Sequence, residues 1–434
     1  MKKFQHMSNQ PTIREIIDKF SDEFQDLHKN TININGQFFT LSPVLLDAII
    51  PTCLLSRTDP LDILEPSFGT GSLIENCRDK FTNTPISIDG VELSTDLYEF
   101  GKDIFKSDQR IHLSNEDFLK FNPRKSYDFI VGNPPFVIIR ETHVLSKTYS
   151  FLKHGRLNLY AIFLWHCINL LKPNGYLSFI IPKSILSASS LHPLRKYIVN
   201  NCDIIDIISP DKATDLFKQV NQNVVVLQLC KKILNPENPF IFIIPHESYV
   251  IFSPFATKWK ERIPKFKSFA DFGVVVHTGS IVSNQVREHL REMPKTSVSP
   301  TAKLIYSHTL RNNQLIFNST PISTKTKHTK TPICKYENLV IEPFQTKIFR
   351  GPAILVNRIV SSVHPRIDPV LYTLEAPFFA ENHVIVITGD LGKLETIMKT
   401  LSSCTTQEFI QEIISGNTQI STSQLQYMIP VLDY

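Results

Sequence analysis

Asn133 is the residue of this chain whose surroundings point most specifically to chemistry. It follows an apolar run, residues 127–132, and precedes Pro134, Pro135 and Phe136. Two consecutive prolines neither extend a sheet nor begin a regular helix, and they push the preceding residue toward extended geometry. A stiff loop at a strand end would therefore present a side-chain amide, outward-facing carbonyls and an aromatic ring, which suits a nucleobase. A plain turn with a core phenylalanine explains the tetrapeptide alone equally well.

Three other predicted strands also end in residues that could bind a ligand. These strands cover residues 62–64, 86–92 and 111–113. The carboxyl ends of parallel strands meet at one edge of a sheet, where ligands of open α/β sheets bind. The residues that follow the strands are therefore expected to lie close together.

The residues at these strand ends together predict an adenosine site. Gly69 and Gly71 would let the backbone approach a ligand closely. Glu92 follows about twenty residues later, the usual place for a carboxylate that accepts from two ribose hydroxyls. Asp117 could accept from an adenine amino group while Phe118 packs on the ring. Each feature alone is more often structural, so the prediction depends on their order and spacing.

The turn after the first strand favours S-adenosylmethionine over a dinucleotide. Glu65 and Pro66 occupy the turn, the third glycine of a dinucleotide fingerprint is missing, and no Walker lysine is present. A carboxylate is unfavourable beside phosphates. It would suit the ammonium group of S-adenosylmethionine, which has no phosphate.

Alternating strands and helices predict an α/β fold with a parallel sheet and right-handed crossovers that cover both faces. Hydrophobic spacing predicts helices over residues 12–27, 43–50, from about 72, 94–105 and 158–171, and further strands over 176–181, 204–208 and 223–229. Residues 140–156 are polar and basic without a strong period, and we expect a mobile loop beside the Asn-Pro-Pro-Phe turn.

Length and composition predict two domains in an untargeted, soluble, cytoplasmic protein. The chain has 434 residues, 42% apolar and 20% charged, with a net charge of +5 and seven dispersed cysteines without a Cys-x-x-Cys pair. No structural zinc or other metal is expected, and no apolar run reaches membrane length. The predicted domains are 1–235 and 236–434, the second a mixed α+β domain with strands near 240–244, 274–277, 353–356 and 383–387 and a basic loop over 320–331.

The ordered motifs resemble those of S-adenosylmethionine-dependent DNA amino-methyltransferases, and their arrangement resembles the gamma class of type II adenine methyltransferases. Residues 36–40 resemble the family's N-terminal cofactor segment, and residues 158–161 and 171–176 resemble its later helix and strand. The resemblance implies a Rossmann-like methyltransferase domain followed by a target-recognition domain. It also implies a cofactor site made of Phe39, Thr40, Glu65, Pro66, Ser67, Gly69, Gly71, Glu92, Leu93, Asp117, Phe118 and Asn133.

The resemblance further implies how a flipped adenine would be methylated. The Asn133 side chain and the Pro134 carbonyl would accept from the amino group, with Pro135 stiffening the loop and Phe136 stacking on the base. Phe217 matches the family's second stacking position, although a core phenylalanine fits equally well there.

The second domain is predicted to read double-stranded DNA. Residues 276–279, Arg358 with 364–366, 381–383 and 425–430 resemble recognition domains of the family. Candidate contacts to phosphates and guanines are Lys325, Lys327, Lys330, Lys347, Arg350, Arg358 and Arg366. The chain is expected to be a monomer. The resemblance also implies a cognate restriction endonuclease encoded nearby.

Three other functions compete with this interpretation. An amino-methyltransferase acting on RNA or on a protein glutamine amide keeps the chemistry, but needs far fewer residues after the fold. A nicotinamide oxidoreductase is disfavoured because this chain lacks the third glycine of the dinucleotide fingerprint. A catalytically inactive specificity subunit is disfavoured because every expected catalytic position is occupied by a suitable residue. Adenine over cytosine rests on the family order alone, since both exocyclic amines pose the same chemical problem.

Overall fold

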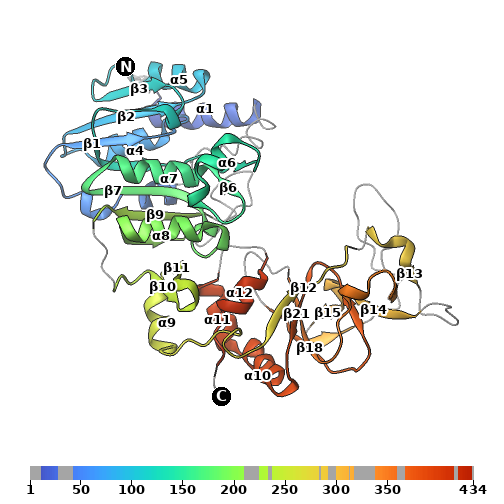
Figure 1. The fold of residues 1–434 in the computed structure, drawn as a ribbon. Coiled ribbons are helices and arrows are strands. Elements are labelled where there is room, and N and C mark those ends of the chain that lie inside the picture. Colours follow the sequence, from blue (N-terminus) through green and yellow to red (C-terminus); the bar gives the residue numbers. More distant parts are fainter. Residues whose placement is uncertain are drawn as a thin grey trace, which may run out of the picture. The chain divides into compact units, whose positions relative to one another are not determined.

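The computed structural model describes ten stretches of the chain that form two compact units (Figure 1). The described stretches are residues 11–27, 43–209, 224–232, 237–282, 285–291, 300–311, 313–316, 338–358, 367–414 and 419–432. Unit 1 comprises Met1–Ile241 and Val250–Ala256, and unit 2 comprises Phe242–Tyr249 and Thr257–Tyr434. Each unit has hydrophobic clusters of its own.

Unit 1 is built on a seven-stranded sheet with the strand order β3-β2-β1-β4-β7-β9-β8. Its strands are β1 (Leu61–Glu65), β2 (Ile86–Glu92), β3 (Ile111–Asn115), β4 (Tyr127–Gly132), β7 (Leu171–Pro182), β8 (Asp203–Ile208) and β9 (Val224–Cys230). The first five of these in sheet order pair in parallel, but β9 pairs antiparallel with both β7 and β8. The predicted α/β class is confirmed. The prediction of a parallel sheet is correct for five strands and wrong for β9, which runs antiparallel to both of its neighbours.

Helices cover both faces of this sheet. They are α1 (Ile13–Leu27), α3 (Pro43–Ala48), α4 (Ser72–Lys80), α5 (Thr95–Phe105), α6 (Val144–Thr148), α7 (Leu159–Leu170) and α8 (His192–Asn201). The chain moves across the sheet in one direction from β1 to β3 and in the other from β4 to β7. Right-handed crossovers therefore place α4 and α5 on one face and α7 on the other. Figure 1 shows α7 and α8 in front of the strands.

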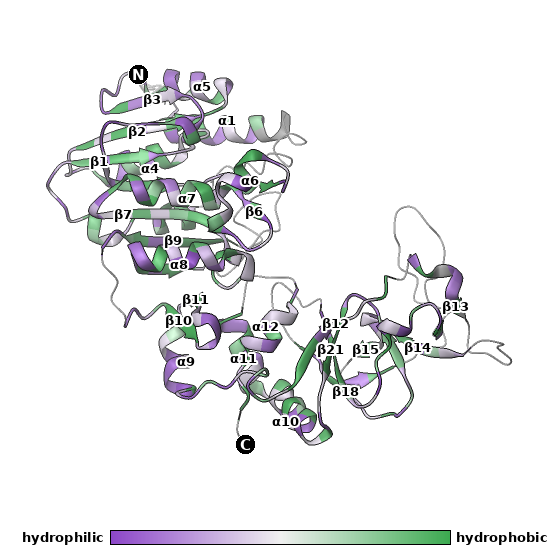
Figure 2. Ribbon diagram, viewed as in Figure 1, coloured by the Kyte–Doolittle hydropathy of each residue, from purple (hydrophilic) through white to green (hydrophobic). Residues whose placement is uncertain are grey.

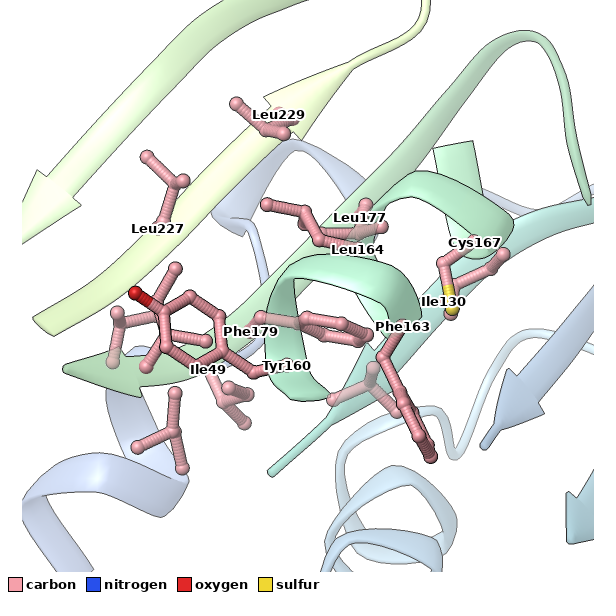
Figure 3. Close-up of a cluster of buried hydrophobic side chains, with 14 of the residues drawn as sticks. Ile49, Ile130, Tyr160, Phe163, Leu164, Cys167, Leu177, Phe179, Leu227 and Leu229 are labelled. Carbon is pink, nitrogen blue, oxygen red and sulfur yellow. The ribbon is translucent and has the colours of Figure 1, made fainter. Parts of the chain in front are cut away.

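Part of the core of unit 1 lies between α7 and the middle of the sheet. Leu164 and Cys167 of α7 pack over Ile130, Leu177 and Phe179, and all five side chains are at most 1% exposed (Figure 3). Figure 2 shows the strands beneath mainly in the hydrophobic colour. A strand buried on both faces is mostly apolar, and all seven buried residues of β9 except Gln228 are apolar.

Residues 140–156 form ordered structure, which corrects the expectation of a mobile loop. They contain α6 and the 3-10 helix η3 (Ser150–Leu152), and they lie between two short paired strands, β5 (Ile138–Ile139) and β6 (Leu157–Asn158). Leu152 and Leu157 are fully buried, and these anchors fix a segment that has no helical or strand period of its own.

Unit 2 contains two four-stranded sheets, β12-β21-β18-β19 and β13-β17-β14-β20. The strands are β12 (Val275–Thr278), β13 (Leu290–Arg291), β14 (Thr301–Ile305), β17 (Asn338–Val340), β18 (Ala353–Asn357), β19 (Val370–Tyr372), β20 (Phe378–Ala380) and β21 (Val384–Thr388), with the pair β15 (Leu310–Arg311) and β16 (Gln314–Leu315). Its helices are α9 (Ala256–Arg262, with Ala256 in unit 1), α10 (Leu391–Ser402), α11 (Cys404–Glu412) and α12 (Thr422–Tyr427). A further pair, β10 (Ile241–Ile244) and β11 (Tyr249–Phe252), contains residues of both units.

The strands predicted for the second half of the chain are present as β10, β12, β18 and β21, within one residue of the predicted starts. Within the described stretches, every helix is too short or too polar to cross a bilayer.

Candidate functional site

Four strand ends of unit 1 converge on one cavity of about 130 Å³. Its walls come from the residues after β1, β2, β3 and β4 and from the start of α7. The lining residues are Pro66, Ser67, Gly69, Glu92, Leu93, Leu97, Glu116, Asp117, Phe118, Leu119, Asn133, Pro135, Leu159 and Phe163. The carboxyl ends of parallel strands share one edge, so this cavity, the larger of two described here, lies where an open α/β sheet binds ligands.

The turn after β1 needs glycine at two positions. Gly69 has φ 57° and Gly71 has φ 86°, both in the left-handed region. A Cβ atom on Gly71 would also lie 2.7 Å from the ring of Phe105. The turn therefore stays tight, and the Gly69 N–H points toward the end of β2, where it donates to Glu92 at 3.0 Å.

Glu92 is a buried carboxylate that backbone groups hold in place. Its two oxygens accept from the N–H groups of Gly69 and Ser94, at 3.0 and 2.8 Å. Burial raises its pKa, against the lowering effect of these hydrogen bonds. A carboxylate oriented in this way keeps lone pairs for ligand hydroxyls, because each oxygen can accept more than one hydrogen bond.

Glu65 lines a second, smaller cavity beside the first. The residues around the smaller cavity are Glu65, Ser67, Phe68, Thr70, Ser72, Leu73 and Asn133. Glu65 is 2% exposed, and its Oε2 atom has no hydrogen-bond partner among the described residues. Burial and the charge of neighbouring Glu92 raise the pKa of Glu65 well above the ordinary carboxyl value. A buried carboxylate with one oxygen left unpaired is costly in its ionised form, so this position favours a cation.

The end of β3 supplies a polar group and an aromatic wall to the larger cavity. The Asp117 carboxylate accepts from the Leu119 N–H at 3.0 Å, as the N-cap of the 3-10 helix η2 (Phe118–Lys120). The Phe118 ring is buried against Phe163, with ring centroids 4.8 Å apart. The two rings form a rigid apolar surface on which a flat ligand ring could pack.

The Asn-Pro-Pro-Phe loop follows β4 directly at the same edge. Asn133 lines both cavities, and Pro135 lines the larger one. Pro134 is buried, and Phe136 is 9% exposed and contacts Tyr160 edge-to-face at 6.1 Å. The structure thus brings Asn133 next to both carboxylates, and it fixes the Phe136 ring through a second aromatic side chain.

Helix α1 braces the turn that separates the two cavities. The Ser21 hydroxyl donates to Thr70 Oγ1 at 2.8 Å, and Arg14 Nη1 donates to the Ser72 carbonyl at 3.1 Å. Phe20 of α1 packs against Leu97, which lines the larger cavity. Residues near the start of the chain therefore hold the walls of both cavities, a role that the sequence did not indicate.

Several wall residues escaped the sequence prediction. They are Leu97, Glu116, Leu119, Leu159 and Phe163 for the larger cavity and Phe68, Thr70, Ser72 and Leu73 for the smaller one. The residues on α7 could have been found from one signal. Leu159 and Phe163 are four residues apart at the start of the first long helix after the Asn-Pro-Pro-Phe loop, so they share one helix face near that loop.

Some predicted residues lie outside the described stretches, namely Phe39, Thr40, Phe217, Lys325, Lys327, Lys330 and Arg366. The remaining basic candidates are in unit 2. Lys347 Nζ donates to the Ser280 carbonyl at 3.4 Å, Arg358 Nη1 donates to the Asn382 carbonyl at 3.5 Å, and Arg350 is exposed.

Three segments of unit 2 that the sequence singled out meet in one place. The Gly279 N–H donates to the Val384 carbonyl, and the Arg358 N–H donates to the His383 carbonyl, each at 2.8 Å. His383 Nδ1 lies 2.6 Å from the carboxylate of Glu381. The motifs around residues 276–279, 358 and 381–383 therefore form one structural cluster.

Comparison with known proteins finds a family whose model matches part of unit 1. Residues 61–217 match the model of the Eco57I restriction-modification methylase family. Over this stretch the chain is similar to restriction-modification methylases. The matched segment begins with β1 and includes all four strand ends of the methylase site.

Two curated relatives of the chain are a modification methylase and a type II methyltransferase. Modification methylase CviBIII of Paramecium bursaria Chlorella virus NC1A is 37% identical over 190 residues, which cover 44% of this chain and 48% of that protein. Type II methyltransferase M.CvrRI of Paramecium bursaria Chlorella virus XZ-6E is 26% identical over 400 residues, covering 92% and 95%. Among solved structures, the type IIG restriction endonuclease BpuSI aligns with a TM-score of 0.44 and 14% identity, covering 97% of this chain and 61% of that one.

S-adenosylmethionine is the cofactor of this methylase fold, and the site residues fit it. The Glu65 oxygen without a partner suits the ammonium group in the smaller cavity. Glu92 has the orientation to accept from ribose hydroxyls, and the apolar walls around Leu93 and Phe118 suit an adenine ring. Leu93 is 69% exposed and lines the larger cavity, so a bound ring would cover part of its side chain.

Proposed function

We propose that this chain is a site-specific DNA methyltransferase that transfers a methyl group from S-adenosylmethionine to the N6 amino group of a flipped adenine in duplex DNA. The observation that carries the proposal is the position of Asn133. It follows β4 directly on a proline-stiffened loop and lines both cavities of the cofactor site. An acceptor base held by this loop would therefore have its amino group beside the methyl donor.

When bound, S-adenosylmethionine supplies an electrophilic methyl group on a sulfonium. The chain's own residues would prepare the nucleophile. The exocyclic nitrogen of adenine is a poor nucleophile because its lone pair is delocalised into the ring. The Asn133 Oδ1 atom and the Pro134 carbonyl would accept its two N–H groups and localise that lone pair toward the methyl donor.

These two acceptors would also stabilise the positive charge that develops on nitrogen. Such groups act most strongly when they are oriented before the reaction, and the two prolines hold this backbone in place. The Phe136 ring would stack on the base, and its contact with Tyr160 keeps its orientation fixed. The amino nitrogen and the methyl carbon would then meet in a single in-line step. Positioning of these two atoms supplies much of the rate of such a step.

The target base must leave the duplex to reach this loop, at a cost of a few kcal/mol in lost stacking. Unit 2 would supply the contacts that select the site and compensate for this cost. Its motif cluster, with Lys347, Arg350 and Arg358, is the candidate reading surface. The proposed biological role is the modification half of a restriction-modification system, in keeping with the names of the relatives.

Methyl transfer with labelled S-adenosylmethionine tests the proposal directly. Purified chain is offered duplex DNA, structured RNA and a mixture of proteins, with the Asn133→Ala variant as the inactive control. Label in DNA alone, located as N6-methyladenine at one sequence by modification-sensitive sequencing, is the expected result. Label in RNA or protein, or in cytosine, would overturn the corresponding part of the proposal.

A further inference from the structure

The insertion formed by residues 138–158 begins and ends beside the candidate acceptor site. Its first and last residues pair in the β5–β6 ladder. Directly outside this ladder, the Leu159 N–H donates to the Val137 carbonyl at 2.8 Å. Pro135 and Leu159, which flank these contacts, both line the larger cavity. The insertion therefore leaves and re-enters the fold at the wall of the site, where Figure 1 shows α6 and β6 side by side.

The insertion is a preformed surface, because several contacts tie it to the helices beneath. The Tyr149 hydroxyl lies 2.8 Å from His166 Nε2 of α7, and the His154 N–H donates to the Ser190 carbonyl at 2.9 Å. Within the insertion, Lys153 Nζ donates to the hydroxyl of Ser146 at 2.7 Å. A partner that binds this surface would lose little conformational entropy in ordering it.

Positive charge is concentrated on this surface. The insertion contains four lysines and arginines and one acidic residue, Glu141, in a chain whose total net charge is +5. Arg140, Lys147 and Arg156 are exposed, and none of their side chains has a hydrogen-bond or ion-pair partner among the described residues. Three cations with unused donors and no nearby carboxylate partner favour an anionic ligand.

Apolar side chains are exposed among these cations. Ile138, Val144 and Phe151 are 57%, 66% and 52% exposed. Alternation of cations with exposed apolar groups matches the sugar–phosphate backbone of a nucleic acid, in which anionic phosphates alternate with apolar sugar edges.

We infer that the insertion 138–158 binds the backbone of the DNA strand that carries the target base. This inference rests on the proposed function. Arg140, Lys147 and Arg156 contact phosphates on either side of the flipped nucleotide, and the exposed apolar side chains lie against deoxyribose. The insertion does not read the sequence. It holds the strand so that the extruded base enters between Pro135 and Leu159 and reaches Asn133.

Removal of the three charges tests the inference. The triple variant Arg140→Gln/Lys147→Gln/Arg156→Gln is compared with Lys80→Gln/Lys102→Gln/Lys106→Gln, which removes the same charge from exposed positions on α4, on α5 and directly after α5. Affinity for duplex DNA is measured by fluorescence anisotropy between 50 and 300 mM salt, about the range over which phosphate contacts weaken strongly. Thermal unfolding and S-adenosylmethionine binding serve as folding controls for both variants.

In the insertion variant, DNA affinity should fall on the order of 10- to 100-fold at physiological salt, and the log–log salt slope should decrease by about 1 to 3. Cofactor affinity should not change, and the control variant should keep both the affinity and the slope within about twofold. Hydrogen exchange on the wild-type protein should show protection of residues 138–156 when duplex DNA is added. An unchanged slope in the insertion variant, or equal losses in both variants, overturns the inference while wild-type DNA methylation still stands. A wild-type protein that methylates no DNA overturns the proposed function itself.

Discussion

Glu65 and Glu92 end neighbouring parallel strands and are almost equally buried, but their surroundings differ. Two backbone N–H groups donate to Glu92, whereas the Oε2 atom of Glu65 has no hydrogen-bond partner among the described residues. Glu92 faces a large cavity with apolar walls, and Glu65 faces a small one lined by hydroxyls. The protein therefore satisfies one carboxylate itself and leaves the other for a cationic ligand.

This comparison explains how one sheet edge can bind two unlike halves of a cofactor. A carboxylate fixed by the backbone serves hydroxyl donors, because its orientation is already set. A carboxylate with one unpaired oxygen serves an ammonium group, because ion pairing removes a cost that exists in the free protein. Asn133 lines both cavities, but in this account it binds neither the ribose hydroxyls nor the ammonium group.

The largest expected effect concerns that shared residue. Asn133→Ala should lower kcat for methyl transfer by about 10²- to 10³-fold, because one oriented acceptor of the developing charge is lost. The affinity for S-adenosylmethionine should stay within about threefold of wild type. Single-turnover kinetics and calorimetry measure the two quantities, with Asn169→Ala, an exposed position on α7, as the control. Turnover near the wild-type value would remove Asn133 from the mechanism.

Cofactor affinity should depend on pH through Glu65. The pKa of Glu65 is raised in the free protein by burial and by Glu92, and the ammonium group would lower it on binding. Binding then releases a proton, so affinity should fall by up to about tenfold per pH unit as the pH drops below the raised pKa. Titrations of wild type and Glu65→Gln over pH 5–9, about the range of buried carboxyl groups, provide the measurement. A wild-type profile as flat as that of the variant would contradict the assignment.

The same substitution at the two carboxylates should change stability in opposite directions. A carboxyl whose folded pKa is raised stabilises the fold at low pH and loses that contribution as the pH rises through the raised pKa. Glu65→Gln should therefore raise the unfolding temperature of the cofactor-free protein at neutral pH. Glu92→Gln should lower stability by about 1–3 kcal/mol, because an amide presents a donor to one of two backbone N–H groups, and this loss outweighs the gain from removing a carboxyl whose pKa burial also raises. Shifts of equal sign in thermal unfolding would contradict the comparison.

The smallest expected effect tests the brace from α1. Ser21→Ala removes the hydroxyl that donates to Thr70, so cofactor affinity should fall about fivefold, in line with roughly 1 kcal/mol for one buried hydrogen bond. Ser150→Ala, at an exposed position, is the matched control. If both variants bind S-adenosylmethionine equally well, α1 does not hold the wall of the smaller cavity.

The strand ends could be predicted from the sequence because their residues are local signals. Gly69, Glu92 and Asn133 each lie at or just after the end of an apolar run. The alternation of strands and helices along the chain brings such positions to one edge of the sheet. The brace from Ser21 to Thr70 could not be predicted, because the two residues are far apart in the chain and neither belongs to a motif. The fold of residues 140–156 was missed for a similar reason, since buried anchors such as Leu152, and not a period, determine it.

A ligand cycle tests the central claim most directly. S-adenosylmethionine carries an ammonium group and a ribose, whereas 5′-methylthioadenosine carries the ribose without the ammonium group. We predict that Glu65→Gln weakens binding of S-adenosylmethionine on the order of 30-fold or more, as for a buried charge that loses its partner, and leaves 5′-methylthioadenosine binding unchanged. Glu92→Gln should weaken both ligands by a similar factor. Equal effects of Glu65→Gln on the two ligands would show that Glu65 does not face the ammonium group, and would contradict the division of the site described above.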